Sequence, residues 1–156
     1  MKLDLGNPLE RQQLLSNAPA RSKKLLVLTE GVVPYLAVEQ VASLARDLYA
    51  LEPACYWIVD YFSPRMFKYR KRMSKGKLRN APFKFDPPDW FGFFEKHGWR
   101  RKQMRYLIEE GERLNRPMKL SPLVKLILAI RAPFVSAERR TAFRQFAGYV
   151  LLERGN

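Results

Sequence analysis

The chain has 156 residues, with 29 Lys and Arg against 15 Asp and Glu, which gives a formal net charge of +14. This length suits a single domain, and a hydrophobic content of 47% with 13% aromatic residues excludes a disordered chain. The one cysteine excludes an intramolecular disulfide framework and fits a reducing compartment. The sequence has neither an apolar run of the roughly 20 residues that a membrane-spanning helix needs nor an apolar signal-peptide core. We therefore expect a cytoplasmic protein without a membrane segment.

The first half of the chain predicts a strand–helix–strand unit. A short helix is expected over Pro8–Leu15, with Asn7 as its N-cap. The continuous apolar run Leu25–Thr29 has the length of a strand and is typical of one buried on both faces of a parallel sheet. Apolar residues then recur at helical spacing over Val38–Leu48, and aromatic and β-branched residues favour a second strand over Tyr56–Phe62. This order predicts a βαβ unit.

The second half adds helices and two further strands, so the predicted class is α/β. In chain order we expect a basic helix from Ser63-Pro64 to about Lys75, a short aromatic helix that starts at Asp86–Asp89 and ends at His97-Gly98, a strand within Trp99–Ile108, a buried helix over Leu123–Ile130 and a final strand over Phe146–Leu152. Two parallel strands and two later ones make a small sheet. An edge strand as apolar as Leu25–Thr29 would then be exposed, which predicts a missing neighbour, either upstream sequence or another subunit.

The conventional catalytic and metal-binding sets are absent from the sequence. One His and one Cys cannot supply the usual metal-ligand spacings, and the chain has neither a GxSxG elbow nor a phosphate-binding loop. We interpret His97 as a helix-end residue and Cys55 as a small buried residue. No residue is therefore assigned a catalytic role, and no metal ligand is proposed.

Candidate binding residues follow the predicted parallel strands. Glu30 and Gly31 come directly after the first of these strands, and Asp60 and Tyr61 lie near the end of the second. Ligands of open α/β sheets bind beyond the carboxyl ends of the strands, where a carboxylate can accept hydrogen bonds from an amine or a hydroxyl. Asp4, ahead of the first helix, is a further candidate, although a turn or loop acid explains each of these residues when it is taken singly.

The order of these segments resembles the leucine carboxyl methyltransferase-like family of class I S-adenosylmethionine-dependent methyltransferases. Asp4-Leu5 comes first, the segment Glu30-Gly31-Val32-Val33-Pro34-Tyr35-Leu36 follows a strand, and Asp86–Phe94 is followed by His97-Gly98-Trp99. The resemblance runs from Asp4 to about Glu153. It implies a partial Rossmann-like methyltransferase sheet, about strands four to seven, with flanking helices in a single domain over residues 1–156.

The resemblance also implies S-adenosyl-L-methionine as the cofactor. Asp4 and Leu5 match the acid–leucine pair that borders the adenine, and Glu30 matches the acid at the methionine end of the cofactor. Gly31 and Tyr35 would shape the pocket floor and the substrate side. The implied reaction is in-line methyl transfer to an oxygen nucleophile, expected to be the carboxylate of a small molecule or a protein.

The resemblance covers only the carboxyl-terminal half of such an enzyme. The glycine-rich loop and the acid that binds the ribose hydroxyls lie upstream of Asp4 in the family, and the chain contains no GxGxxG-like segment. We therefore expect an incomplete copy, which an upstream segment or a complementing subunit would complete and which need not be active alone. A further hypothesis is a degenerate copy that pairs with an active homologue and regulates it.

The alternative function is a basic interaction module. From Arg65 to Arg79 the chain has eight basic residues and no acid, with Phe67 and Tyr69 interleaved as on some nucleic-acid surfaces. A second cluster comprises Arg100, Arg101, Lys102 and Arg105. The sequence has no RNP signature, zinc-finger spacing or KH loop. The open interpretations are a solvated basic face, which we favour, a nucleic-acid surface, or attraction to an acidic partner or a membrane surface.

Overall fold

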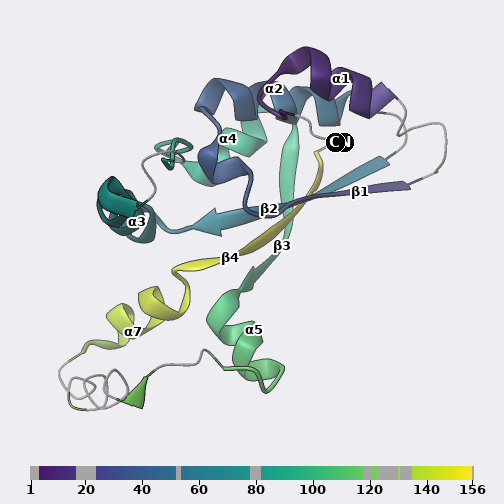
Figure 1. Ribbon diagram of the computed structural model, residues 1–156. Helices are drawn as coiled ribbons and strands as arrows, with labels where there is room; N and C mark the ends of the chain where they lie inside the picture. Colours follow the sequence, from purple (N-terminus) through teal and green to yellow (C-terminus); the bar gives the residue numbers. More distant parts are fainter. Residues whose placement is uncertain are drawn as a thin grey trace.

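The computed structural model describes residues 4–16, 24–51, 54–77, 82–117, 121–122, 130 and 135–155. These residues form an α/β fold with a four-stranded sheet of order β1-β2-β4-β3 (Figure 1). The strands are β1 (Lys24–Thr29), β2 (Ala54–Phe62), β3 (Trp99–Tyr106) and β4 (Ala147–Arg154). The helices are α1 (Pro8–Ser16), the 3-10 helix η2 (Val33–Tyr35), α2 (Val38–Tyr49), α3 (Pro64–Lys77), α4 (Trp90–Lys96), α5 (Leu107–Arg113) and α7 (Ala137–Arg144).

The α/β class is confirmed. Each element that was predicted within the described residues is present, with its ends shifted by a few residues at most. Residues 123–129 of the helix predicted over Leu123–Ile130 lie outside the described residues, as does Arg79 at the end of the basic run.

The sheet combines a parallel pair with an inserted antiparallel strand. β1 and β2 pair in parallel, and α2 connects them, so the predicted βαβ unit is confirmed. β4 pairs antiparallel with β2 on one side and with β3 on the other. Among the described strands, β4 therefore runs against the other three.

The helix ends are fixed by short-range hydrogen bonds. Asn7 Oδ1 accepts a bond of 3.0 Å from the Leu9 N–H, which confirms Asn7 as the capping residue of α1. Asp89 Oδ1 accepts a bond of 3.0 Å from the Gly92 N–H at the start of α4. Gly98 follows α4 with φ of +84°, a left-handed conformation that stops the helix.

The core lies between the sheet and the helices α1, α2 and α4, which cover one of its faces (Figure 1). Trp57 in β2 is completely buried, and its ring makes edge contacts with Phe94 at 5.3 Å and Trp99 at 5.5 Å between centroids. The Trp57 indole N–H donates a buried hydrogen bond of 3.0 Å to Thr29 Oγ1. Further buried core residues are Val41, Leu44, Ala45, Leu48, Val59, Val150 and Leu152.

The expectation that Leu25–Thr29 is buried on both faces is wrong. Leu25 and Val27 pack against the core, but Leu26 is 60% exposed and Leu28 is 57% exposed. The physical reason is that the core forms on one face of β1, while the alternate residues Leu26 and Leu28 lie on the other face. An apolar run without polar alternation predicts a strand with both faces buried. In the described part of the chain, only one face of β1 is covered.

A buried ion pair joins α1 to α2. Arg11 is 0% exposed, and its guanidinium donates to Asp47 Oδ2 at 2.6 Å and to Ser43 Oγ at 2.6 Å. A third bond, of 2.8 Å, goes to the backbone oxygen of Leu5. Arg11 therefore fixes α1 and the segment that precedes it against α2.

In the part of the chain that the structure describes, no helix is both long and apolar enough to cross a membrane.

Candidate functional site

Three strands bring polar side chains together at the carboxyl end of the parallel pair. Glu30 follows β1, and Asp60 lies near the end of β2. The Gly31 N–H donates a bond of 2.7 Å to Asp60 Oδ2, and the Tyr149 hydroxyl of β4 donates a bond of 2.6 Å to Glu30 Oε1. Asp60 and Tyr149 are also direct cross-strand partners. We call Glu30, Gly31, Asp60 and Tyr149 the carboxylate edge.

The turn after β1 depends on glycine. Gly31 has φ of +66°, a conformation that strains any residue with a Cβ atom, and apart from its two chain neighbours no described residue has a heavy atom within 4 Å of the place where that Cβ would be. The backbone at Gly31 is therefore open to the approach of a ligand, while its N–H is held by Asp60.

The two carboxylates of this edge differ in their surroundings. Asp60 is 9% exposed, and burial raises the pKa of its carboxyl, an effect that the hydrogen bond from the Gly31 N–H opposes and the charge of Glu30 reinforces. Glu30 is exposed. The hydrogen bond that Glu30 accepts from the Tyr149 hydroxyl raises the pKa of Tyr149 to about 12. Ionisation of the phenol would break that bond and place a second negative charge beside Glu30.

Titration of Tyr149 tests this arrangement. In Glu30→Gln we expect the pKa of Tyr149 to fall from about 12 toward the ordinary tyrosine value of about 10, because the neutral amide no longer disfavours the phenolate. The measurement is an NMR titration of the tyrosine Cζ signals, with Tyr149→Phe to assign the resonance. Replacement of the exposed acid Glu39 by Gln is the matched control. An unchanged pKa in Glu30→Gln would show that the two side chains are not in contact.

Asp4 and Leu5, which the resemblance also implies for the cofactor site, lie in the segment before α1. Asp4 is exposed and caps its own turn by accepting a bond from the Gly6 N–H. The Gln40 side chain joins this turn to the start of α2, since its Nε2 donates to the Gly6 carbonyl and its Oε1 accepts from the Ala37 N–H. Leu5 contributes its carbonyl to Arg11.

Tyr35 lies in η2, and its ring contacts Phe83 with 5.0 Å between centroids. The structure thus brings Glu30 and Gly31 together with Asp60. It places Asp4 and Leu5 at the start of α2, and Tyr35 against the segment that precedes α4.

The basic clusters differ in how they are neutralised. Arg65, Lys68 and Arg72 of α3 are exposed. On β3, Arg100 and Lys102 both pair with Glu153, at 3.1 and 2.6 Å. Two further exposed pairs join Arg105 to Glu110 and Arg144 to Glu112. Several basic side chains of the second cluster and its surroundings therefore already have acidic partners.

His97 and Cys55 have structural positions. His97 ends α4, and desolvation together with the charges of Arg46 and Lys96 lowers its pKa. Cys55 is 2% exposed in β2, and burial raises the pKa of its thiol. Within the described ranges, no group of three or more His, Cys, Asp and Glu side chains is arranged to hold a metal ion.

Two contributors to the site were missed in the sequence analysis. Tyr149 belongs to a strand that was predicted, but its contact with Glu30 depends on the insertion of β4 beside β2. Gln40 lies three residues after the N-cap Ala37, and its side chain accepts the Ala37 N–H as the glutamine of a capping box does, but alanine at the N-cap hides the usual Ser/Thr signal from the sequence. The sequence matches no protein-family model and no curated protein.

Proposed function

We propose that this chain is the carboxyl-terminal part of an S-adenosylmethionine-dependent O-methyltransferase that resembles the leucine carboxyl methyltransferase-like family. The observation that carries the proposal is the order and sense of the strands. β4, the last in sequence, lies between β2 and β3 and runs against both. In class I methyltransferases the seventh strand is inserted in the same way between the fifth and the sixth. β1 to β4 would then correspond to strands four to seven.

The residues at the carboxylate edge fit the methionine end of the cofactor. Glu30 presents an exposed carboxylate that can accept hydrogen bonds from an ammonium group. Gly31 leaves open space beside the backbone, and the bonds from Tyr149 to Glu30 and from Gly31 to Asp60 hold the turn in place. Asp4 and Leu5 would border the adenine. When bound, the cofactor supplies an activated methyl group on a sulfonium.

The proposed reaction needs no acid or base from the protein. A carboxylate acceptor is already ionised at neutral pH, so the attacking oxygen needs no general base. The task of the chain is to orient the two reactants and to exclude water, and good orientation can contribute about 7–11 kcal/mol to rate acceleration. This is why we assign binding residues and no catalytic residue.

The proposed enzyme needs more of the sheet than these strands. The sequence has no glycine-rich loop of the kind that completes a Rossmann-like cofactor site. The free edge of β1, with Leu26 and Leu28 exposed beside it, is where further strands would continue the sheet. We propose that an upstream segment or a complementing subunit supplies them.

Calorimetric titration with S-adenosylmethionine tests the proposal. We expect saturable binding in the micromolar range, about −8 kcal/mol, that is lost in Glu30→Ala because the ammonium of the cofactor loses its carboxylate partner. Glu39→Ala removes an exposed acid from α2 and should leave binding unchanged. Circular dichroism of each variant shows that it is folded. No heat from the folded chain, or equal binding by Glu30→Ala, would contradict the proposed half-site.

A further inference from the structure

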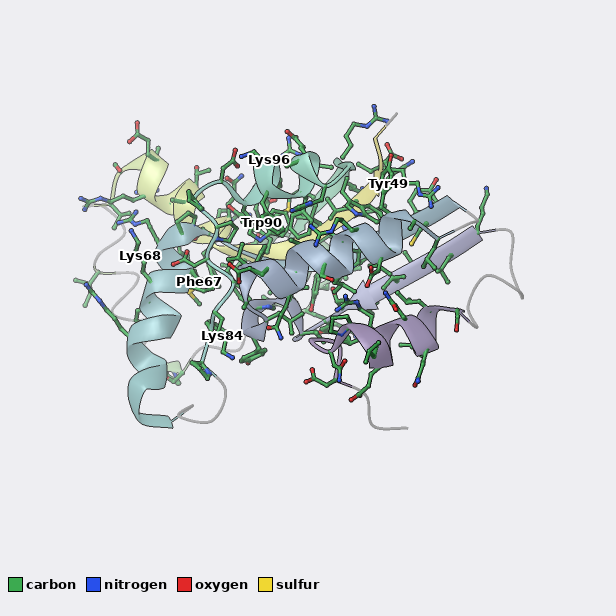
Figure 2. The ribbon with its side chains drawn as sticks, turned by 90° about the horizontal axis from the view of Figure 1, so that it is seen from above. Tyr49, Phe67, Lys68, Lys84, Trp90 and Lys96 are labelled. Carbon is green, nitrogen blue, oxygen red and sulfur yellow. The ribbon has the colours of Figure 1, made fainter. Side chains whose placement is uncertain are left out.

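A cavity of about 250 Å³ adjoins the carboxylate edge and shares Asp60 with it. It is lined by the end of β2, the start of α3, the segment before α4 and the first residues of α4. The segment before α4 is fixed there, because the Lys84 and Phe85 N–H groups both donate to the Pro34 carbonyl of η2, at 2.8 and 3.2 Å. Figure 2 shows Phe67 on α3 and Trp90 on α4, both of which line the cavity.

The charge of this cavity is opposite to that of the chain. Three aspartates line it, Asp60, Asp86 and Asp89, and none of the described lining residues is basic. This is notable in a chain with a net charge of +14. Arg65 and Lys84 flank lining residues in sequence, but both are exposed and neither belongs to the lining.

The three aspartates have different roles. Asp89 caps α4, and Asp60 accepts the Gly31 N–H. Asp86 is exposed at the rim and makes no hydrogen bond or ion pair with any residue that the structure describes. Asp86 thus offers a free carboxylate. Asp60 is buried, which disfavours its negative charge, and a cation in the cavity would stabilise that charge.

One wall of the cavity is aromatic. Tyr61, Trp90 and Phe91 contact one another with 5.1 to 5.5 Å between ring centroids. The Trp90 ring stands at 89° to that of Tyr61, so the two rings meet edge to face. This cluster already attracts a cation, because the Arg101 guanidinium lies 4.7 Å from the centroid of Phe91.

We propose that this cavity binds a small organic cation, a protonated or quaternary amine. Aromatic faces and carboxylates together are the combination that attracts such cations, since the rings remove water from the charged group while the carboxylates balance it. The volume is below the range of roughly 300–1,000 Å³ that drug-sized ligands occupy, so a single head group fits. A carboxylate would meet three aspartates here and be repelled.

This site bears on the methyl acceptor, an extension that rests on the proposed function. An acceptor whose ammonium group enters the cavity would lie next to the carboxylate edge, since Asp60 belongs to both sites. The acceptor class would then be an amino acid derivative, which carries an ammonium group as well as the carboxylate that accepts the methyl group, rather than a simple anionic acid. Binding of the cation itself requires no cofactor.

A matched pair of ligands tests the site without S-adenosylmethionine. Choline carries a quaternary ammonium, and 3,3-dimethyl-1-butanol is its neutral carbon isostere. At constant ionic strength we expect choline to change the fluorescence of Trp90 saturably and to bind at least about tenfold more tightly than the isostere. Trp57 and Trp99 are buried in the core, so Trp90 is the tryptophan that reports on the cavity.

Two variants locate the binding. Asp86→Asn removes the free rim charge and should weaken choline binding about tenfold, whereas Glu95→Gln, at an exposed acid of α4 outside the cavity, should not change it. Absent binding, equal binding of the isostere, or no effect of Asp86→Asn would each overturn the site. Choline binding without S-adenosylmethionine binding would refute the proposed cofactor half-site alone, and the reverse would refute this site alone.

Discussion

Replacement of Asp47 by alanine should lower the free energy of unfolding by about 3–5 kcal/mol. Arg11 is completely buried, and Asp47 is its only carboxylate partner among the described residues. Removal of that carboxylate leaves a buried guanidinium with only Ser43 and the Leu5 carbonyl to stabilise it. A buried charge that loses its partner is among the most destabilising changes in a folded protein.

Two companion variants separate charge from packing in this pair. Arg11→Met removes the buried charge and retains an unbranched apolar side chain, so it should cost less than Asp47→Ala. Asp47→Asn keeps an acceptor oxygen and should be intermediate. Urea unfolding followed by circular dichroism gives the free energies. A loss below about 1 kcal/mol in Asp47→Ala would mean that water reaches Arg11 through the partly exposed Asp47 side.

Replacement of Trp57 by alanine should cost about 3–5 kcal/mol. Trp57 is completely buried at the centre of the sheet, where it contacts the rings of Phe94 and Trp99. Truncation to alanine would remove these contacts, leave a cavity and break the hydrogen bond to Thr29, whose hydroxyl would keep only its bond of 3.3 Å to the Ile58 carbonyl. The measurement is the midpoint and slope of the unfolding transition in urea.

The hydrogen bond of Trp57 can be tested separately if the alanine variant fails to fold. Thr29→Val keeps the shape of the side chain but leaves the indole N–H unpaired, which should cost about 1–3 kcal/mol. Thr29→Ser retains the hydroxyl and should cost less. Equal stability of Thr29→Val and the parent chain would show that the buried bond contributes nothing, and the loss in Trp57→Ala would then reflect packing alone.

Local sequence signals predicted most of the fold. The cap at Asn7, the helical spacing of Val41, Leu44 and Leu48, and the aromatic strand around Trp57 each identify an element without knowledge of its neighbours. The apolar run of β1 was misjudged because burial depends on what packs on each face, and Leu26 and Leu28 lie on the open one. Local pattern cannot reveal that difference.

The candidate site was predictable only in part, for a related reason. Glu30 follows β1 and Asp60 lies near the end of the parallel β2, so the topology rule brings them to one edge, and the bond between Gly31 and Asp60 links the two strands there. Tyr149 reaches Glu30 from 119 residues away, and that contact depends on the register of β4. Arg11 occupies a short polar helix, where nothing local distinguishes a buried arginine from a solvated one.

Because one edge of β1 is open, the free energy of local opening differs between the strands of the sheet. β2 and β4 each pair with strands on both sides, whereas β1 has one described neighbour and two exposed leucines. Local opening of β1 has to break a single ladder, so its free energy lies below that of global unfolding. Thr29, which bonds Trp57, and Glu30 stand at the end of this strand. Fraying of β1 would therefore reach the candidate site before the rest of the domain unfolds.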